Sequence, residues 1–148
     1  MFSSSAKVTL DSKGRMAIPT RFREGIVARC GGSLVGAMDT NDPCVLLYPA
    51  PEWEGAARRL LRLSGNKASV RDMQRRMIGR VFEMEMDSHG RILIPAKLRE
   101  AANLTKQAVL VGLGGKFELW DEQRWDKWCE ASDANDDELP PELESLLL

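Results

Sequence analysis

The chain has few of the residues from which metal sites, disulfide frameworks and active sites are usually built. It contains one histidine, His89, and three widely scattered cysteines that form no CxxC pair: Cys30, Cys44 and Cys129. A disulfide framework or a zinc site is therefore not expected. Catalysis is not expected either, because His89 has no cysteine near it. Asp11 and Asp87 each have an arginine close by that would keep them ionised.

Long apolar segments are missing as well. No run approaches the roughly 18 residues of a membrane span, and the first 13 residues lack the apolar segment of a signal peptide. We therefore expect a cytoplasmic protein without a membrane partner. The glycine-rich stretch at 112–116 is followed by strand-like FELW rather than a helix, so it does not predict a phosphate loop. Nothing in the sequence indicates a small-molecule ligand or a cofactor.

What the chain does contain is a repeat. The segment DSKGRMAIPTRFRE at 11–24 returns as DSHGRILIPAKLRE at 87–100, with eight of fourteen positions identical. A charged loop is thus repeated along with the apolar pattern. The offset of 76 residues exceeds the period of solenoid repeats, so two related half-domains are predicted. Each half has the order charged loop, short helix, two strands and aromatic-anchored helix.

The repeat also predicts the boundaries of these parts. We expect a first half at 1–63, a connecting helix at 64–80, a second half at 81–130 and an acidic tail at 131–148. With 148 residues and 43% hydrophobic content, the chain can bury about two thirds of its unfolded surface in one compact domain.

The charge is unevenly distributed, although its formal sum is only −1. Residues 1–30 carry +4 and residues 71–106 carry +3, whereas residues 121–148 carry −8. A chain of this kind can present a basic face despite an acidic pI. A mixed, solvated surface with an acidic tail is the simpler alternative, but the duplication of the basic segment favours the basic face.

Each copy of the repeated motif predicts a hairpin followed by a helix. Residues 7–11 alternate like a strand, residues 12–14 form a tight turn, and residues 15–18 pair back as a second strand. Pro19 fits the first turn of a helix, with three apolar residues on one side: Phe22, Ile26 and Val27. The second copy repeats the hairpin around the turn 88–90 and opens its helix at Pro95.

The remaining segments complete a coarse map. Strand pairs are predicted at 33–39 with 44–48 and at 108–113 with 116–120. Residues 50–64 read as a helix with an apolar stripe of Trp53, Ala57, Leu60 and Leu61, and residues 69–80 as the connecting helix. The tryptophans and methionines are more simply core or interface residues than base-stacking groups. Acids and two prolines beyond Cys129 predict a mobile tail, whose last leucines could dock locally.

The arginine of each motif is the candidate binding residue. Arg15 and Arg91 each follow a glycine-containing turn, and a planar guanidinium can grip phosphate or contact guanine O6 and N7 bidentately. The alternative is structural, since Asp11 and Asp87 could neutralise or orient these arginines across the hairpin. Two copies in register, each followed by basic residues at a helix start, favour contacts to a partner that is itself repetitive.

The double DSxGR and IP motif, with CVLLYPAPEWE between the copies and KFELWDEQRW after them, closely resembles the MraZ family of bacterial transcription regulators. The resemblance covers the chain up to about Trp128. It implies a mainly β fold with short helices: an AbrB-like swapped-hairpin (double-split) β-barrel formed by the two repeats as an intrachain pseudo-dimer. It also implies ring-like homo-oligomers that bind direct DNA repeats upstream of the division and cell-wall gene cluster.

The resemblance places the DNA-contact arginines on Arg15 and Arg91. The full set of expected DNA contacts is Arg15, Arg91, Lys13, His89, Arg21, Lys97 and Lys7. His89 could equally be an exposed bystander. Six further residues are expected to shape the motifs: Asp11, Gly14, Pro19, Asp87, Gly90 and Pro95.

These observations predict a cytoplasmic, nucleoid-associated DNA-binding transcriptional repressor that acts as a homo-oligomer on double-stranded DNA. No cofactor and no metal are expected. The alternative is a ring-forming assembly module that does not bind nucleic acid. Salt-dependent DNA binding would separate the two, because phosphate contacts release counterions.

Overall fold

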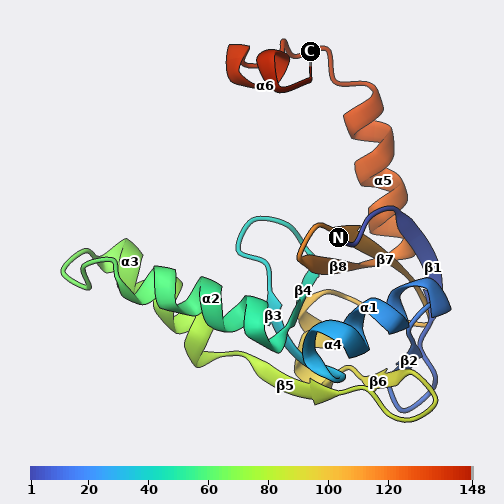
Figure 1. Ribbon diagram of the computed structural model, residues 1–148. Coiled ribbons are helices and arrows are strands. Elements are labelled where there is room, and N and C mark those ends of the chain that lie inside the picture. Colours follow the sequence, from blue (N-terminus) through green and yellow to red (C-terminus); the bar gives the residue numbers. More distant parts are fainter. Residues whose placement is uncertain (148) are drawn as a thin grey trace.

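The computed structural model describes residues 1–147 and contains a six-stranded antiparallel sheet and a separate two-stranded ribbon (Figure 1). In spatial order the sheet strands are β1 (Ser5–Thr9), β7 (Gln107–Leu113), β8 (Lys116–Asp121), β4 (Val45–Pro49), β3 (Ser33–Met38) and β5 (Phe82–Glu85). The ribbon pairs β2 (Arg15–Ala17) with β6 (Arg91–Leu93). Within residues 1–147 no ladder joins β1 to β5, so the sheet is not closed by backbone pairing.

The two halves of the chain are interleaved in this sheet. Strand β1 of the first half pairs with β7 of the second, and β5 of the second half pairs with β3 of the first. Strands β4 and β8 meet at the centre, around the pair Leu46 and Glu118. The predicted mainly β fold with short helices and an AbrB-like arrangement of two repeats is therefore confirmed, with an open sheet in place of a closed barrel.

The local hairpin predicted for each motif is correct at its turn and wrong beyond it. Leu10 and Met16 form a single bridge, after which β1 continues along β7 while β2 pairs with β6. The physical reason is burial. Met16 and Ile92 are 0% and 1% exposed, and pairing β2 with β6 places both side chains in the core through one short ladder.

Short helices follow each strand of the ribbon. Helix α1 (Thr20–Cys30) begins after Pro19, and α4 (Ala96–Ala101) begins after Pro95, so the predicted start points are correct within one residue. Phe22 and Ile26 are buried, but Val27 is 55% exposed, contrary to the prediction. One helical step of about 100° turns Val27 away from the stripe formed by Phe22, Ile26 and the half-buried Cys30.

The segment between the halves is helical and projects from the body (Figure 1). It comprises α2 (Ala50–Leu61), α3 (Ala68–Gln74) and the π-helical turn η1 (Arg75–Gly79). The indole Nε1 of Trp53 donates to the carbonyl of Met77 over 3.1 Å and ties α2 to η1. Of the predicted apolar stripe, Leu61 is exposed because α2 ends in this projecting region.

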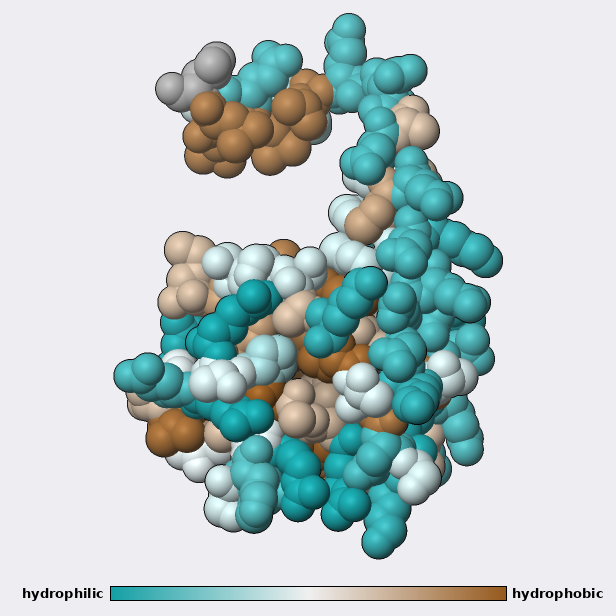
Figure 2. Space-filling view, turned by 90° about the vertical axis from the view of Figure 1, so that its right-hand side faces the viewer, coloured by the Kyte–Doolittle hydropathy of each residue, from teal (hydrophilic) through white to brown (hydrophobic). Residues whose placement is uncertain are grey.

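The C-terminal part leaves the body in another direction. Helix α5 (Glu122–Asp133) continues beyond Cys129, and α6 (Pro141–Leu147) lies apart from the sheet (Figure 1). The predicted docking of the last leucines is wrong for the described residues, since Leu143, Leu146 and Leu147 are exposed; Leu148 lies outside them. Figure 2 shows open space between the apolar side of α6 and the body of the molecule. Among residues 1–147 no helix has the length and apolar content of a membrane span.

Aromatic side chains pack together in the core and again at the start of α5. Phe2, Phe22 and Phe117 pack together in the core, with ring centroids 4.3 to 6.1 Å apart. Trp120 is buried beneath Trp125 and Trp128, whose rings stack at 5.1 Å. These tryptophans contact one another, in agreement with their prediction as packing residues.

Candidate nucleic-acid interface

The two repeated motifs meet in the ribbon around a pseudo-two-fold axis. Met16 lies opposite its own counterpart Ile92, and Arg15 and Ala17 lie opposite Leu93 and Arg91. Because opposite residues of an antiparallel pair point to the same face, Met16 and Ile92 face the core. The outer face therefore carries the two arginines on one diagonal and Ala17 and Leu93 on the other.

Each arginine is held by the aspartate four residues earlier. The Asp11 carboxylate accepts hydrogen bonds from the backbone N–H of Lys13 and Arg15, both at 2.9 Å, and from Arg15 Nε at 2.7 Å. Asp87 accepts the same three bonds, from the N–H groups of His89 and Arg91 and from Arg91 Nε at 3.0 Å. The two motifs therefore form nearly identical loops.

The backbone of each loop is equally regular. Gly14 N donates to the Asp11 carbonyl and Gly90 N to the Asp87 carbonyl, both at 3.0 Å. Gly14 has φ +88° and Gly90 has φ +75°, a region that favours glycine. Glycine is thus required at the one turn position where both copies keep it.

These hydrogen bonds set the charge state of the two aspartates. The backbone N–H of Arg15, and next its side chain, lower the pKa of Asp11 to about 2. The backbone N–H of Arg91 is the largest cause that lowers the pKa of Asp87. Both carboxylates are therefore ionised at neutral pH, as expected for groups that accept several N–H bonds.

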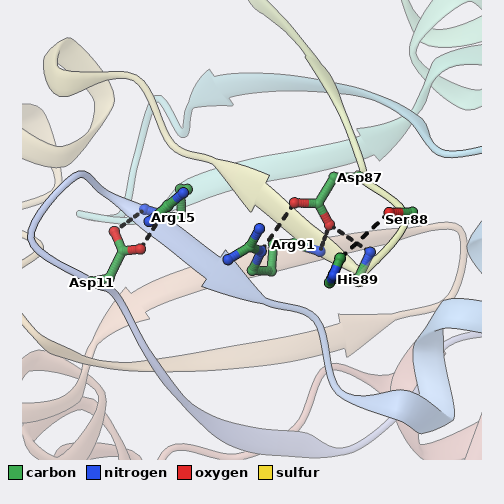
Figure 3. A network of polar contacts seen from close by, with 6 residues as sticks. All are labelled: Asp11, Arg15, Asp87, Ser88, His89 and Arg91. Carbon is green, nitrogen blue, oxygen red and sulfur yellow. Dashed lines mark hydrogen bonds and ion pairs between the residues drawn. The ribbon is translucent and has the colours of Figure 1, made fainter.

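The arginines retain free donors despite these ion pairs. Each pair uses Nε only, and among residues 1–147 the two terminal nitrogens of Arg15 and of Arg91 donate no hydrogen bond. The side chains are 39% and 40% exposed. Figure 3 shows both guanidinium groups on the same face of the ribbon, with Asp11 at one end and Asp87 at the other. The aspartates thus orient the arginines and leave their outer forks available.

An arginine from each half also packs against the turn of the other half, a contact that the sequence did not predict. Arg99 of α4 packs against Gly14, where an added Cβ would lie 2.6 Å from Arg99 Nε, and Arg23 of α1 packs against Gly90 in the same way. Arg23 Nε donates to the carbonyl of Ile18, and Arg99 Nε donates to the carbonyl of Ile94. The signal was present in the repeat, because both arginines are among its identical positions, but nothing local shows that the contact crosses between halves.

The structure does not bring all the expected contact residues together. Lys13 and His89 lie at the two turn tips beside the arginine pair and are exposed. Arg21 lies on α1, where Nη2 donates to the Ser5 carbonyl over 2.8 Å and the guanidinium covers the Phe22 ring. Lys7 lies on β1 with its Nζ 3.7 Å from Glu122.

Lys97 contributes to a different feature. It lines a cavity of about 360 Å³ together with two arginines of the connecting segment, Arg76 and Arg80. Arg21, Lys7 and Lys97 thus lie on elements outside the ribbon, whereas Arg15 and Arg91 lie on its strands and Lys13 and His89 lie in its two turns.

One cluster of metal-ligand atoms lies elsewhere. The ligand atoms of Asp39, Cys44 and Glu118 lie within 4.8 Å of one another. Burial raises the pKa of the Cys44 thiol, and Asp39 accepts hydrogen bonds from two backbone N–H groups of its own loop. Glu118 accepts from Trp120 Nε1 over 3.0 Å. Both carboxylates thus have protein partners: Asp39 organises the β3–β4 loop, and Glu118 binds Trp120 within β8.

Two interleaved repeats around a paired ribbon define an AbrB-like protein with a duplicated loop, and comparison with known sequences gives the family. The profile described as "MraZ protein, putative antitoxin-like" matches residues 1–76 and again residues 77–142. The chain therefore belongs to the MraZ family.

Full-length relatives agree with this assignment. The transcriptional regulator MraZ of Halorhodospira halophila is 43% identical over 152 residues, and that of Pseudomonas aeruginosa is 44% identical over 151. The transcriptional regulator MraZ of Nitrosomonas eutropha is 45% identical over 149 residues. In each case the alignment covers 100% of both chains.

Proposed function

We propose that this protein is a sequence-specific, double-stranded DNA-binding transcriptional repressor that acts on the nucleoid in the cytoplasm. The observation that carries the proposal is the pair of oriented arginines on the outer face of the ribbon, with free terminal nitrogens. The major groove of B-DNA admits a two-stranded β-ribbon, and an arginine fork matches guanine O6 and N7. The names of the relatives, transcriptional regulators, support the same function.

The turn tips complete the proposed interface. Lys13 and His89 lie one at each end of the ribbon, where they would contact the phosphates on either side of the groove. Arg21, Lys97 and Lys7 are proposed as outer phosphate contacts, weaker in effect because Arg21 and Lys7 already have protein partners. Asp11 and Asp87 position the arginines, and Gly14, Gly90, Pro19 and Pro95 shape the loops and the helix starts that follow.

We further propose that several copies assemble into a ring and bind direct repeats upstream of the division and cell-wall gene cluster. A ring presents its ribbons to a linear duplex in the same sense each time, so the boxes it reads should be direct repeats. Weak single contacts become tight binding when several ribbons engage one duplex, because the linked sites raise the effective concentration.

Removal of the two arginines tests the DNA interface. Arg15→Ala and Arg91→Ala should each weaken binding to the protein's own upstream DNA by about 1 kcal/mol or more per engaged subunit, because each guanidinium loses its contact to a base or a phosphate. Gel-shift titration measures the loss. Arg58→Ala is the matched control, since Arg58 is an exposed arginine on the projecting α2. Unchanged affinity in the double variant would exclude this interface.

Two further measurements test DNA binding against the assembly-module alternative and test the spacing of the boxes. The affinity of the wild type should fall steeply with salt, whereas an assembly module would show no such binding. Inserting five base pairs between two boxes turns one box by about half a helical turn, so the combined affinity should fall toward that of a single box. Affinity that is indifferent to the insertion would contradict joint engagement.

A further inference from the structure

The ribbon is almost two-fold symmetric. The positions at which its two motifs differ support a further inference, which rests on the proposed function. The axis relates each residue of one motif to the residue 76 positions later, so that Arg15 opposite Leu93 corresponds to Arg91 opposite Ala17. Backbone bonds follow the same symmetry: Ile18 N donates to the Gly90 carbonyl at 2.8 Å, and Ile94 N to the Gly14 carbonyl at 2.9 Å.

A perfectly symmetric ribbon would have no direction on DNA. Rotation about its axis exchanges the two motifs and presents the same groups to a duplex that runs in either sense. Direct repeats require the opposite property, because every subunit must distinguish one end of its box from the other. Only positions at which the two motifs differ can supply that distinction.

Within the turns and strands of the ribbon, residues 11–18 and 87–94, three positions differ. They are Lys13 and His89, Met16 and Ile92, and Ala17 and Leu93. Met16 and Ile92 are buried in the core and cannot reach a duplex. The other two pairs are exposed, and Leu93 is a 54% exposed leucine on the same face as the two arginines.

We propose that Leu93, together with the difference between Lys13 and His89, sets the direction in which this ribbon reads its DNA box. Leu93 lies opposite Arg15, and such neighbours have Cβ atoms about 5 Å apart on one face. Its side chain contacts a thymine methyl group beside the base read by Arg15, because that methyl is the apolar group of the major groove. Ala17, opposite Arg91, is too short to make the equivalent contact.

The turn tips strengthen the same asymmetry. Lys13 carries a flexible ammonium group with three donors to the phosphates at one end of the ribbon. At the other end His89 offers a short ring, and its Nδ1 lies 3.4 Å from Ser88 Oγ. The box therefore has guanine contacts in both halves and a thymine in only one, which makes it differ from its own reverse complement.

Selection from a pool of random duplexes tests this inference and works for any operator sequence. Each duplex contains one randomised segment of about ten base pairs, one helical turn. The full-length wild type should enrich a consensus that differs from its reverse complement. It should bind that box roughly tenfold more tightly than a palindrome built from either half, the effect of about one lost base contact.

Two symmetrised variants supply the decisive comparison. His89→Lys with Leu93→Ala gives both motifs the lysine and the alanine, and Lys13→His with Ala17→Leu gives both the histidine and the leucine. Each should enrich a palindromic consensus, and the tenfold preference should fall below about twofold. All four positions are exposed, so circular dichroism should show an intact fold.

The other outcomes would overturn the inference. If both symmetrised variants keep the non-palindromic consensus of the wild type, other residues set the direction. If Leu93→Ala changes the oligomer size in light scattering and leaves the consensus unchanged, Leu93 is a contact between copies of the chain. If the wild type enriches no sequence, the proposed function itself fails, and that result is distinct from a palindromic wild-type consensus, which would remove only the directional role.

Discussion

At the scale of the residue, the two aspartates show how one side chain can organise a loop and an arginine together. Asp11 binds the backbone N–H groups of Lys13 and Arg15 and the Nε of Arg15. One carboxylate therefore fixes both the turn and the direction of the guanidinium. A lysine in place of Arg15 has a single ammonium group, so it could not pair with Asp11 and also present two parallel donors outward.

The ionisation of Asp11 gives a testable prediction. Its pKa is about 2 in the folded protein, against an ordinary value of 3.8, so its contribution to stability is present above pH 3.8. That contribution is lost as the pH falls through about 2. The carboxyl carbon shift in an NMR titration should have its midpoint well below 3.8. A midpoint near 3.8 would show that the bonds to Arg15 and Lys13 do not persist in solution.

A second prediction at this scale concerns the turn glycine. Gly14→Ala should destabilise the fold by about 1 to 3 kcal/mol, because φ is +88° and the added methyl group meets Arg99. Urea unfolding measures the loss. Gly55→Ala is the matched control, since Gly55 lies within α2 and its Cβ would have an ordinary contact at 3.5 Å, so this change should be neutral or stabilising. Equal effects of the two substitutions would contradict the role of the turn.

At the scale of the element, the ribbon covers part of the core with one face and forms the proposed DNA contact with the other. Met16→Ala should cost about 2 to 5 kcal/mol in the free energy of unfolding, because its side chain is fully buried against Ile92 and the sheet. Leu93→Ala, on the outer face of the same ribbon, should cost less than about 0.5 kcal/mol. Similar losses for the two variants in denaturant titrations would mean that the ribbon does not have one buried and one solvent face.

The elements show where sequence reasoning works and where it stops. The alternation in 7–11, the prolines before α1 and α4 and the glycine turns are local signals, and they place most strands and helices within a few residues. The partner of each strand is not a local property. Residues 15–17 are too few to show whether they pair with β1 or with β6, and burial of Met16 against Ile92 decides it.

The same limit applies to the site. The repeat alone identified Arg15 and Arg91 as a matched pair, because a duplicated charged loop has no purpose in the core. That they lie on one diagonal of one ribbon depends on a pairing between residues 76 apart. Lys7 belongs to the same basic segment, and β1 places its Nζ 3.7 Å from Glu122, a contact that the sequence does not predict.

At the scale of the whole molecule, the interleaved strands predict that neither half folds by itself. Separate fragments of residues 1–76 and 77–148 should each lack cooperative thermal unfolding, because β1, β2 and β3 pair with β7, β6 and β5 of the other half. Mixing the two fragments should restore a cooperative transition in circular dichroism. A cooperative transition for either fragment alone, in a monomer, would show that the interleaving is not needed for stability.

The interleaving also fixes when this protein can fold. Strand β1 is synthesised before its partner β7, which begins about a hundred residues later along the chain. At roughly 5 to 20 residues per second, the first strand waits about 5 to 20 s for its neighbour. Throughout that time its hydrogen-bonding edge is open to other chains, and charged side chains such as Lys7 oppose such pairing. The sheet therefore cannot be completed before β7 is synthesised, and slowing the ribosome would lengthen the exposure of β1 rather than assist its folding.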